Sequence, residues 1–339
     1  MQPTHPRILL AEAFDPAAVE KLRTVGDVLA LQACDESTLR RAVLDCDALL
    51  IRTATRVSRA VIENATRLRV IGRGGVGLEN IDLAAARERG IVVVYTPDAA
   101  TDAVADLTVG LMIALLRKLT ACNAMVRSGQ FREAREQSCS RELSELTLGI
   151  LGMGRIGRAV ARRGRSGFGM TVIYNDILSP GWLDFTATPV TKGQLYADSD
   201  VVTLHVPLTD ATRHLIDAAA LTQFKKGALL INTSRGAVVD SLALAQALAE
   251  GRLAGAALDV VEPEPLPTEH PLMQAPNTLL TPHIGARSFA GLARMNSIVE
   301  DVIRVLQGQT PLYPAWTDDG PNPAALQRWA TAVAPPELR

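Results

Sequence analysis

The sequence 147-TLGILGMGRIGR-158 combines a strand, a glycine turn and the start of a helix. Its run 148–151 is short and apolar, as expected of a strand buried in a parallel sheet. Gly152, Gly154 and Gly157 then give the pattern G-x-G-x-x-G, in which glycines allow a tight turn and a close approach of the backbone to a ligand. The stretch therefore predicts a strand–turn–helix unit of a parallel α/β sheet.

Strand-like and helix-like stretches alternate on both sides of this unit. Five strands are expected before it, in 7–13, 28–33, 48–52, 69–72 and 91–97, and six from it onward, in 147–153, 170–174, 200–206, 228–233, 254–260 and 277–283. A long helical segment over about 102–128 separates the two series, and the last periodic stretch covers about 288–307. The second series therefore looks inserted into the domain of the first, because the final helix follows it and must pack somewhere.

Composition excludes several classes of function. With 35 Lys+Arg against 36 Asp+Glu the formal charge is −1, and aromatic residues make up 4%. The near-neutral charge and the few aromatic residues give no reason to expect binding to nucleic acid, and the charge gives none to expect binding to an anionic membrane. The apolar run 107–116 is much shorter than the ~20 residues of a membrane span, and the N-terminus does not resemble a signal peptide. We expect a soluble, cytoplasmic protein with a mainly irregular, proline-rich segment over 311–339.

The cysteines indicate no metal or disulfide. They are scattered and show no C-x-x-C spacing, so neither a zinc site nor a disulfide framework is expected. The residues are Cys34, Cys46, Cys122 and Cys139. We expect reduced thiols and no bound metal.

An acidic residue strengthens the interpretation of the glycine turn. Asp176 ends the next strand, VIYND, 19 residues after Gly157. A carboxylate there can accept both ribose hydroxyls of NAD and would repel the 2′-phosphate of NADP, and Ile177 and Leu178 offer no cation to that phosphate. Asp176 could instead merely cap a turn. The combined spacing favours dinucleotide binding with NAD, held by the glycines together with Arg155 and Ile156.

Three further polar residues follow successive strands of the second series. Arg235 follows ALLINTS, Glu264 follows AALDVVEP and His283 follows NTLLTP. Ligands bind outside the carboxyl ends of strands in a doubly wound sheet, so the three could converge there. A guanidinium matches a carboxylate, an imidazole can transfer a proton, and a carboxylate can orient that imidazole. Taken singly, they could be an ion-pair partner, a solvated acid and a helix-entry residue.

From about residue 48 to 308 the chain resembles the D-isomer-specific 2-hydroxyacid dehydrogenases. The matching stretches are RGGVGLENIDL, LGILGMGRIGR, LHVPLTDATRHLI, INTSRGAVVD, AALDVVEPEP and TPHIGA. The resemblance implies that Arg235 binds the substrate carboxylate and that Glu264 and His283 form the acid–base pair. It also implies that Asp259 contacts the nicotinamide carboxamide and that His205 and Pro207 line the cofactor cleft, to which we add Thr233.

The resemblance also implies a fold, an assembly and a substrate class. A Rossmann NAD-binding domain, residues 99–287 with the interface helix, is expected within a flavodoxin-like substrate domain, residues 1–98 and 288–339. A homodimer is expected through the helix of 102–128. The substrates are small D-2-hydroxy and 2-oxo acids of the 3-phosphoglycerate, hydroxypyruvate or glyoxylate type.

The substrate side of the cleft is expected to contain two arginines. In the family it is formed by stretches such as ALLIRT and GRGGVG, which here place Arg52, Gly75 and Val76, with Arg73 nearby. Two arginines could bind a second anionic group such as a phosphate, although a surface or salt-bridge position explains them equally well.

Two other functions stay open. Some relatives are NAD-sensing transcriptional corepressors that keep the Arg–Glu–His set, and phosphite-oxidising relatives keep it as well. Formate-oxidising relatives carry glutamine where this chain has Glu264. Turnover of 2-oxo acids with NADH separates an enzyme from a sensor.

Overall fold

The computed structural model describes residues 5–32, 35–317 and 320–321. The chain divides into two compact units: unit 1 comprises Met1–Ala100 and Arg287–Arg339, and unit 2 comprises Thr101–Ala286. Cys34 and most of the final proline-rich segment lie outside the described residues. The other three cysteines are free thiols.

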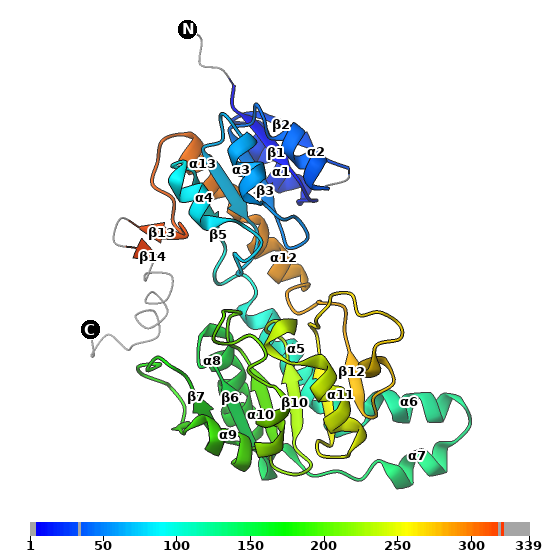
Figure 1. Ribbon diagram of the computed structural model, residues 1–339. Coiled ribbons are helices and arrows are strands. Elements are labelled where there is room, and N and C mark those ends of the chain that lie inside the picture. The colour runs from blue at the N-terminus through cyan, green and yellow to red at the C-terminus, as the bar shows by residue number, and fades with distance from the viewer. Residues whose placement is uncertain (1–4, 33–34, 318–319, 322–339) are drawn as a thin grey trace. The chain divides into compact units, whose positions relative to one another are not determined.

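Unit 1 is a parallel sheet of five strands in the order β2-β1-β3-β4-β5, which is the flavodoxin-like order (Figure 1). Its strands are β1 (Arg7–Leu10), β2 (Asp27–Ala30), β3 (Ala48–Ile51), β4 (Val70–Arg73) and β5 (Val92–Tyr95). Its helices are α1 (Pro16–Arg23), α2 (Glu36–Ala42), α3 (Arg59–Asn64), α4 (Leu83–Glu88), α12 (Phe289–Asn296) and α13 (Ile298–Leu306).

Both faces of this sheet are covered, as the near-continuous apolar strands require. Side chains of α2, α3 and α4 form one core with the sheet, and those of α1 and α13 form the other. Helix α13, from the end of the chain, lies so close to β4 that a Cβ on Gly72 would come within 2.5 Å of Val302 Cγ2. The return of the chain therefore completes unit 1.

The segment after α13 is more regular than the prolines predicted. It runs along β5, where Tyr95 N donates to Tyr313 O at 3.1 Å and Ala315 N donates to Val93 O at 2.8 Å. Asp301, 4% exposed, accepts hydrogen bonds from the backbone of Leu312 and Tyr313 at 2.7 and 2.8 Å. A buried carboxylate thus ties the segment to α13, and two short strands follow, β13 (Trp316–Thr317) and β14 (Gly320–Pro321).

Unit 2 is a parallel sheet of seven strands in the order β12-β11-β10-β9-β6-β7-β8. Its strands are β6 (Thr147–Leu151), β7 (Thr171–Asn175), β8 (Thr188–Pro189), β9 (Val201–Leu204), β10 (Leu229–Asn232), β11 (Gly255–Leu258) and β12 (Thr278–Leu280). Its helices are α5 (Thr101–Leu116), α6 (Leu119–Arg127), α7 (Phe131–Gln137), α8 (Arg155–Arg162), α9 (Lys192–Asp198), α10 (Ala218–Gln223) and α11 (Ser241–Ala249), with short helical turns η1 (Leu143–Glu145), η2 (Arg163–Gly167), η3 (Gly236–Val238) and η4 (Pro271–Met273).

This strand order is that of a Rossmann domain with one additional strand, and it confirms the predicted fold class. Helices α9, α10 and α11 share a core with one face, and α5 and α8 share a core with the other. The order reverses between β6 and β9, and ligands of such sheets bind in the crevice at the carboxyl ends of the strands on either side of that point. The motif 147–158 lies there.

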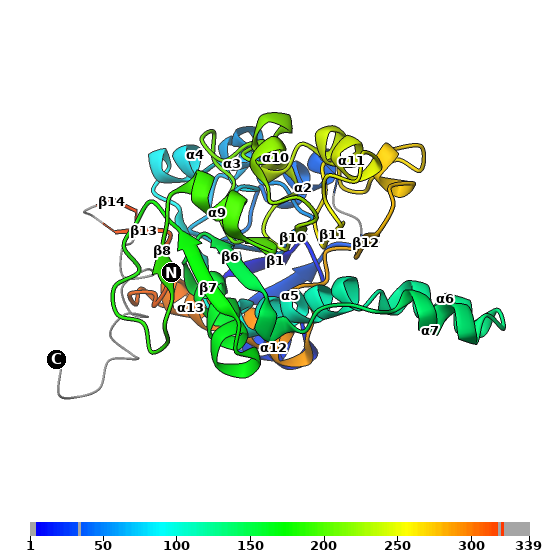
Figure 2. The same ribbon diagram turned by 90° about the horizontal axis from the view of Figure 1, so that it is seen from below.

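The predicted long helix over 102–128 is broken. Lys118 adopts a left-handed conformation with φ 51°, and α5 and α6 meet there at a bend of 57°. Figure 2 shows α6 and α7 extending away from the sheet of unit 2. No single helix in the described part of the chain is long and apolar enough to cross a membrane; only the bent pair α5 and α6 passes on length and composition.

Candidate active site

The glycine turn after β6 packs two glycines against the chain and leaves one facing open space. Gly152 has φ +97°, and a Cβ there would lie 2.8 Å from the carbonyl oxygen of His205. A Cβ on Gly157 would lie 2.0 Å from the carbonyl oxygen of Gly152. Gly154, the N-cap of α8, would carry a Cβ with no atom of the neighbouring structure within 4 Å. This open cradle at a helix N-terminus fits the pyrophosphate of a dinucleotide; Arg155 and Ile156 form the first turn behind it.

Asp176 follows β7 and holds two loops by their backbone amides. One carboxylate oxygen accepts from Met153 N at 2.6 Å and the other from Leu178 N at 2.9 Å. The hydrogen bond from Leu178 N caps a turn, which is the alternative role considered above. The hydrogen bond from Met153 N joins the carboxylate to the glycine turn. Each oxygen keeps a lone pair, so the carboxylate fits ribose hydroxyls while it holds the turn.

His205 follows β9 and presents a neutral ring. Its Nε2 pairs with Thr203 Oγ1 at 3.0 Å, and its Nδ1 is buried without a hydrogen-bond partner. Burial lowers the pKa of His205 to about 3. The backbone carbonyl of His205 lies against Gly152, so the residue is adjacent to the glycine turn. Pro207 is exposed nearby in the sequence.

Arg235 is presented by a turn that a buried amide holds. Asn232, the last residue of β10 and fully buried, donates through Nδ2 to Arg235 O at 2.8 Å. Its Oδ1 accepts from Ser234 N at 3.0 Å and from Ser234 Oγ at 2.8 Å. Thr233 is fixed from the other side, because its hydroxyl lies 2.9 Å from that of Thr108 on α5. The turn after β10 is therefore held at three successive residues.

Glu264 and His283 are joined directly. Glu264 Oε1 lies 2.8 Å from His283 Nδ1, and both side chains are partly exposed. A carboxylate on Nδ1 leaves Nε2 as the nitrogen that can exchange a proton with a ligand. The structure thus brings together the two residues that follow β11 and β12, while Arg235 follows the adjacent strand β10 at the same edge of the sheet.

The loop that carries His283 is built around Asp259. This residue is 2% exposed, and its carboxylate accepts from Thr281 Oγ1 at 2.6 Å, Ile284 N at 2.9 Å and Gly285 N at 2.8 Å. The backbone N–H of His283, which has φ 52°, donates to Asp259 O at 2.9 Å. Three internal donors give Asp259 a structural role that the sequence did not reveal, and any contact with nicotinamide would be additional to it.

A second cluster beside Glu264 was not predicted. Glu262 pairs with Arg213 Nη1 and with His214 Nε2, each at 2.9 Å. The hydrogen bond from His214, supported by that from Arg213, holds the pKa of Glu262 below its usual value. Glu262 O also accepts from Ser241 Oγ at 3.0 Å. Glu262, two residues before Glu264, therefore links segments of the chain that follow β9, β10 and β11. The sequence signalled this residue only as the first glutamate of EPEP.

The predicted substrate residues lie in unit 1. Arg73, 6% exposed, occupies no surface position; its Nη1 donates to Gly74 O at 3.3 Å and its Nη2 to Thr53 Oγ1 at 3.4 Å. Gly75 has φ +149°, and a Cβ there would lie 1.3 Å from Arg73 Nη1, so glycine makes room for the guanidinium. Val76 follows, half-buried.

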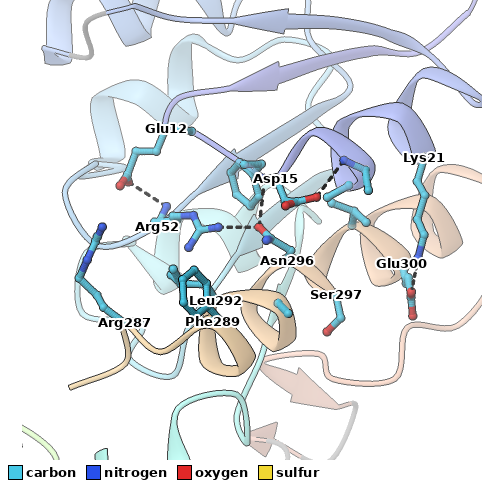
Figure 3. A pocket seen from close by; sticks show the side chains of 16 residues that line it. Glu12, Asp15, Lys21, Arg52, Arg287, Phe289, Leu292, Asn296, Ser297 and Glu300 are labelled. Carbon is cyan, nitrogen blue, oxygen red and sulfur yellow. Dashed lines mark hydrogen bonds and ion pairs between the residues drawn. The ribbon is translucent and has the colours of Figure 1, made fainter. Parts of the chain in front are cut away.

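Arg52, at the end of β3, is separately anchored. Its backbone N–H donates to Glu12 Oε1 at 2.8 Å, and its Nη2 donates to Asn296 Oδ1 at 2.5 Å (Figure 3). The guanidinium lies 4.8 Å from the centre of the Phe14 ring. Arg52 thus contacts α12 and the loop after β1, whereas the partners of Arg73 are in the turns after β3 and β4.

Comparisons with known proteins agree with this geometry. Residues 109–285 match the family model for the NAD binding domain of D-isomer specific 2-hydroxyacid dehydrogenases. A D-3-phosphoglycerate dehydrogenase of Methanocaldococcus jannaschii is 38% identical over 307 residues, which are 89% of this chain but 58% of that protein. A glyoxylate reductase of Thermofilum pendens is 38% identical over 317 residues, covering 90% of this chain and 93% of the reductase.

Solved structures share the fold over most of the chain. The TT0316 protein from Thermus thermophilus has a TM-score of 0.85 and 38% identity, covering 91% of this chain and 99% of its own. A D-lactate dehydrogenase from Aquifex aeolicus, complexed with NAD and lactic acid, has a TM-score of 0.81 and 28% identity, covering 89% and 96%. The likeness therefore extends over both units.

Proposed function

The chain belongs to the D-isomer specific 2-hydroxyacid dehydrogenases, NAD-dependent oxidoreductases of 2-hydroxy acids, and we propose that its own substrate is a small D-2-hydroxy acid or the matching 2-oxo acid. The observation that carries the proposal is the Glu264–His283 pair at 2.8 Å, set at the same sheet edge as Arg235 and the glycine cradle. A proton-transferring pair, an anion-binding cation and a dinucleotide cradle are what this reaction requires.

NAD, when bound, supplies or accepts the hydride. Gly154 and the N-terminus of α8 would hold its pyrophosphate, and Asp176 would hold the adenosine ribose. Because a carboxylate repels a 2′-phosphate, NAD is preferred over NADP. His205, Pro207, Thr233 and Asp259 complete the proposed cofactor cleft.

Arg235 binds the substrate carboxylate and polarises the neighbouring carbonyl oxygen. The guanidinium offers two parallel donors at a fixed geometry, and the Asn232 turn fixes where they lie. The cation of Arg235 would stabilise the negative charge that develops on the carbonyl oxygen during reduction.

His283 transfers the proton. Its Nε2 donates to the developing alkoxide during reduction and accepts the hydroxyl proton during oxidation, while Glu264 on Nδ1 keeps the ring oriented and stabilises the imidazolium. Arg52, Arg73, Gly75 and Val76 of unit 1 form the proposed substrate side, for acids of the 3-phosphoglycerate, hydroxypyruvate or glyoxylate type.

The chain functions as a homodimer in the cytoplasm. Helices α6 and α7 extend from unit 2 (Figure 2). The large apolar side chains of Leu119, Val126 and Phe131 on them are exposed. Exposed apolar side chains gathered on one extension favour contact with a second copy. The free thiols of the described cysteines support a location in a reducing compartment.

The test is a panel of 2-oxo acids, including glyoxylate, hydroxypyruvate, pyruvate and 3-phosphohydroxypyruvate, with consumption of NADH and NADPH followed in parallel. We expect rapid oxidation of NADH with at least one acid and much slower oxidation of NADPH. A protein that binds NADH but reduces none of the acids would be a sensor and would contradict the proposal.

A further inference from the structure

Unit 1 contains a cavity of about 670 Å³ that is lined partly by charged and partly by apolar side chains. It lies between the loop after β1, the end of β3 and the segment that contains α12 and the start of α13 (Figure 3). Its volume is within the range of small-molecule sites, roughly 300–1,000 Å³. Acids of two or three carbons would leave most of it unfilled, so the cavity has room for a larger ligand.

One end of the cavity carries an excess of positive charge. Arg52 and Arg287 both line it and lie near each other (Figure 3). The nearest acid, Glu12, is engaged by the backbone N–H groups of Arg52 at 2.8 Å and Thr55 at 3.0 Å. Burial lowers the pKa of Arg52, and repulsion from Arg287 adds to this. Two guanidinium groups beside one carboxylate leave a net positive site.

Arg287 keeps its donors for a ligand, whereas Arg52 contributes mainly its charge. Arg52 directs Nη2 to Asn296, but its Nε is buried without a hydrogen-bond partner. Among the residues that the structure describes, Arg287 has no hydrogen bond or ion pair. An anion seated between the two arginines would accept from the free donors of Arg287 and lie in the field of both charges.

The cavity also carries an apolar surface. Phe289, the first residue of α12, is 96% exposed, and Leu292 lies one turn further along the same helix. Phe14 contributes its ring beneath Arg52. At the opposite end Lys21 Nζ and Glu300 Oε1 form an ion pair at 2.9 Å, so their charges compensate each other. An apolar body would therefore lie on Phe289 and Leu292, with its charge at the arginines.

We propose that this cavity binds an organic anion, with its carboxylate or phosphate held between Arg52 and Arg287 and its apolar body against Phe289 and Leu292. Arg287 is the first residue of unit 1 after the chain leaves unit 2. A ligand here therefore fixes the segment by which the chain returns. The anion has two possible sources. It is the distal part of a longer 2-oxo acid, an assignment that rests on the proposed function, or it is a separate effector, an assignment that is independent of that function.

The test measures direct binding to the full chain by isothermal titration calorimetry. The probe is phenylacetate, which has no 2-oxo group and cannot be reduced; acetate lacks its apolar body and 2-phenylethanol lacks its charge. Phenylacetate is expected to bind at least about tenfold more tightly than either. Arg287→Gln and Phe289→Ala are each expected to weaken it about tenfold, since each removes one of the two recognised features.

Two control variants locate the bound probe. Arg40→Gln removes an exposed charge of unit 1 outside the cavity and should leave binding unchanged. Arg235→Gln should also leave it unchanged, because Arg235 is proposed to bind a substrate carboxylate elsewhere. Loss of binding in Arg235→Gln, with none in Arg287→Gln, would place the probe at the candidate active site and overturn the proposal. Equal affinity for all three probes would overturn it as well.

Steady-state kinetics then distinguish the two sources of the anion. Phenylacetate that competes with the best 2-oxo acid occupies the place of a substrate's distal group, whereas inhibition or activation that is not competitive identifies an effector. Either pattern, if lost in Arg287→Gln, supports the site. If no 2-oxo acid is reduced, the proposed reaction fails, while the calorimetric result stands independently.

Discussion

A permanent charge at the end of a buried strand needs a fixed support, and Asn232 provides it for Arg235. The buried amide donates to Arg235 O at 2.8 Å and accepts from both donors of Ser234. Because these hydrogen bonds of the turn are internal, the guanidinium is presented at a defined place before any ligand binds. Such preorganisation suits recognition of a planar carboxylate.

Substitution Arg235→Lys is therefore expected to lower kcat/KM for the best 2-oxo acid by roughly 10²–10³-fold, although the charge is kept, because an ammonium cannot reproduce the two-pronged contact. NADH affinity, measured by fluorescence titration, should be nearly unchanged. A lysine variant with the kcat/KM of the wild type would show that Arg235 does not bind the substrate.

The neutral ring of His205 predicts a dependence of stability on pH. Its pKa of about 3 in the folded chain lies below the ordinary value of about 6.5 in an unfolded one. Between these values the unfolded state binds more protons, so this contribution to stability is complete above pH ~6.5 and falls by up to about 1.4 kcal/mol for each pH unit below it.

Urea denaturation of wild type and His205→Asn between about pH 4 and pH 7 checks this. The variant should lose less stability on acidification, while His5→Gln, an exposed histidine, should behave as the wild type. Identical slopes for wild type and His205→Asn would mean that the ring is protonated in the folded protein.

The sequence predicted the polar residues at the sheet edge better than it predicted their supports. Gly152, Gly157 and the position of Asp176 follow from local spacing, because strand, turn and helix are consecutive. The structural role of Asp259 does not follow in this way. Its partners Thr281 and Gly285 are 22 and 26 residues away, and only the registers of β11 and β12 bring them together.

The loops of the candidate site are joined through Glu262. Its bonds to Arg213 and His214, and from Ser241, connect three segments of the chain next to the proposed acid–base pair, Glu264 and His283. We therefore expect Glu262 to act as a positioning residue for Glu264, two residues further along the same loop, and not as a catalytic residue.

Glu262→Gln is expected to lower kcat on the order of tenfold, because small displacements of a catalytic group slow the reaction, while KM for NADH changes little. Arg213→Gln should act through the same contact, so the double variant should be no slower than the slower single one. Effects that multiply would show that Glu262 acts independently of Arg213. Glu262→Asp should restore part of the rate if the contact positions the loop.

In unit 1 the last segment is attached through Asp301. Asp301→Asn exchanges a charged acceptor of two backbone N–H groups for a neutral amide with one accepting oxygen. It is expected to lower the free energy of unfolding by about 1.5–3 kcal/mol and to speed hydrogen exchange at Ala315 N. Glu300→Gln, an exposed neighbour, should change stability by less than about 1 kcal/mol. Equal effects of the two substitutions would contradict this role.

The helices show where sequence periodicity is insufficient. Residues 102–128 read as one helix, but Lys118 in a left-handed conformation divides them. No glycine or proline marks the break, so it could not be found in the sequence. The segment after α13 reads as irregular, yet β5 lacks a partner on one edge and pairs with it. In both cases tertiary context overrides local preference.

For the chain as a whole, the order of strands and helices was enough to predict the architecture. Two β-α series with a final helix left over imply that one series is inserted in the other, and α13 packs on β4 as this requires. The reaction was predictable because three residue types follow three adjacent strands. The cavity and the position of Arg287 beside Arg52 were not, since they depend on segments far apart in the sequence.

One measurement joins the fold to the proposed chemistry: the enantiomer of glycerate formed from hydroxypyruvate and NADH, resolved by chiral chromatography. We expect D-glycerate from the wild type. His283→Ala should form it roughly 10²–10⁴-fold more slowly, the usual contribution of a general acid, with NADH binding retained. Formation of L-glycerate, or an undiminished rate in His283→Ala, would contradict the assignment of a D-specific dehydrogenase that uses the Glu264–His283 pair.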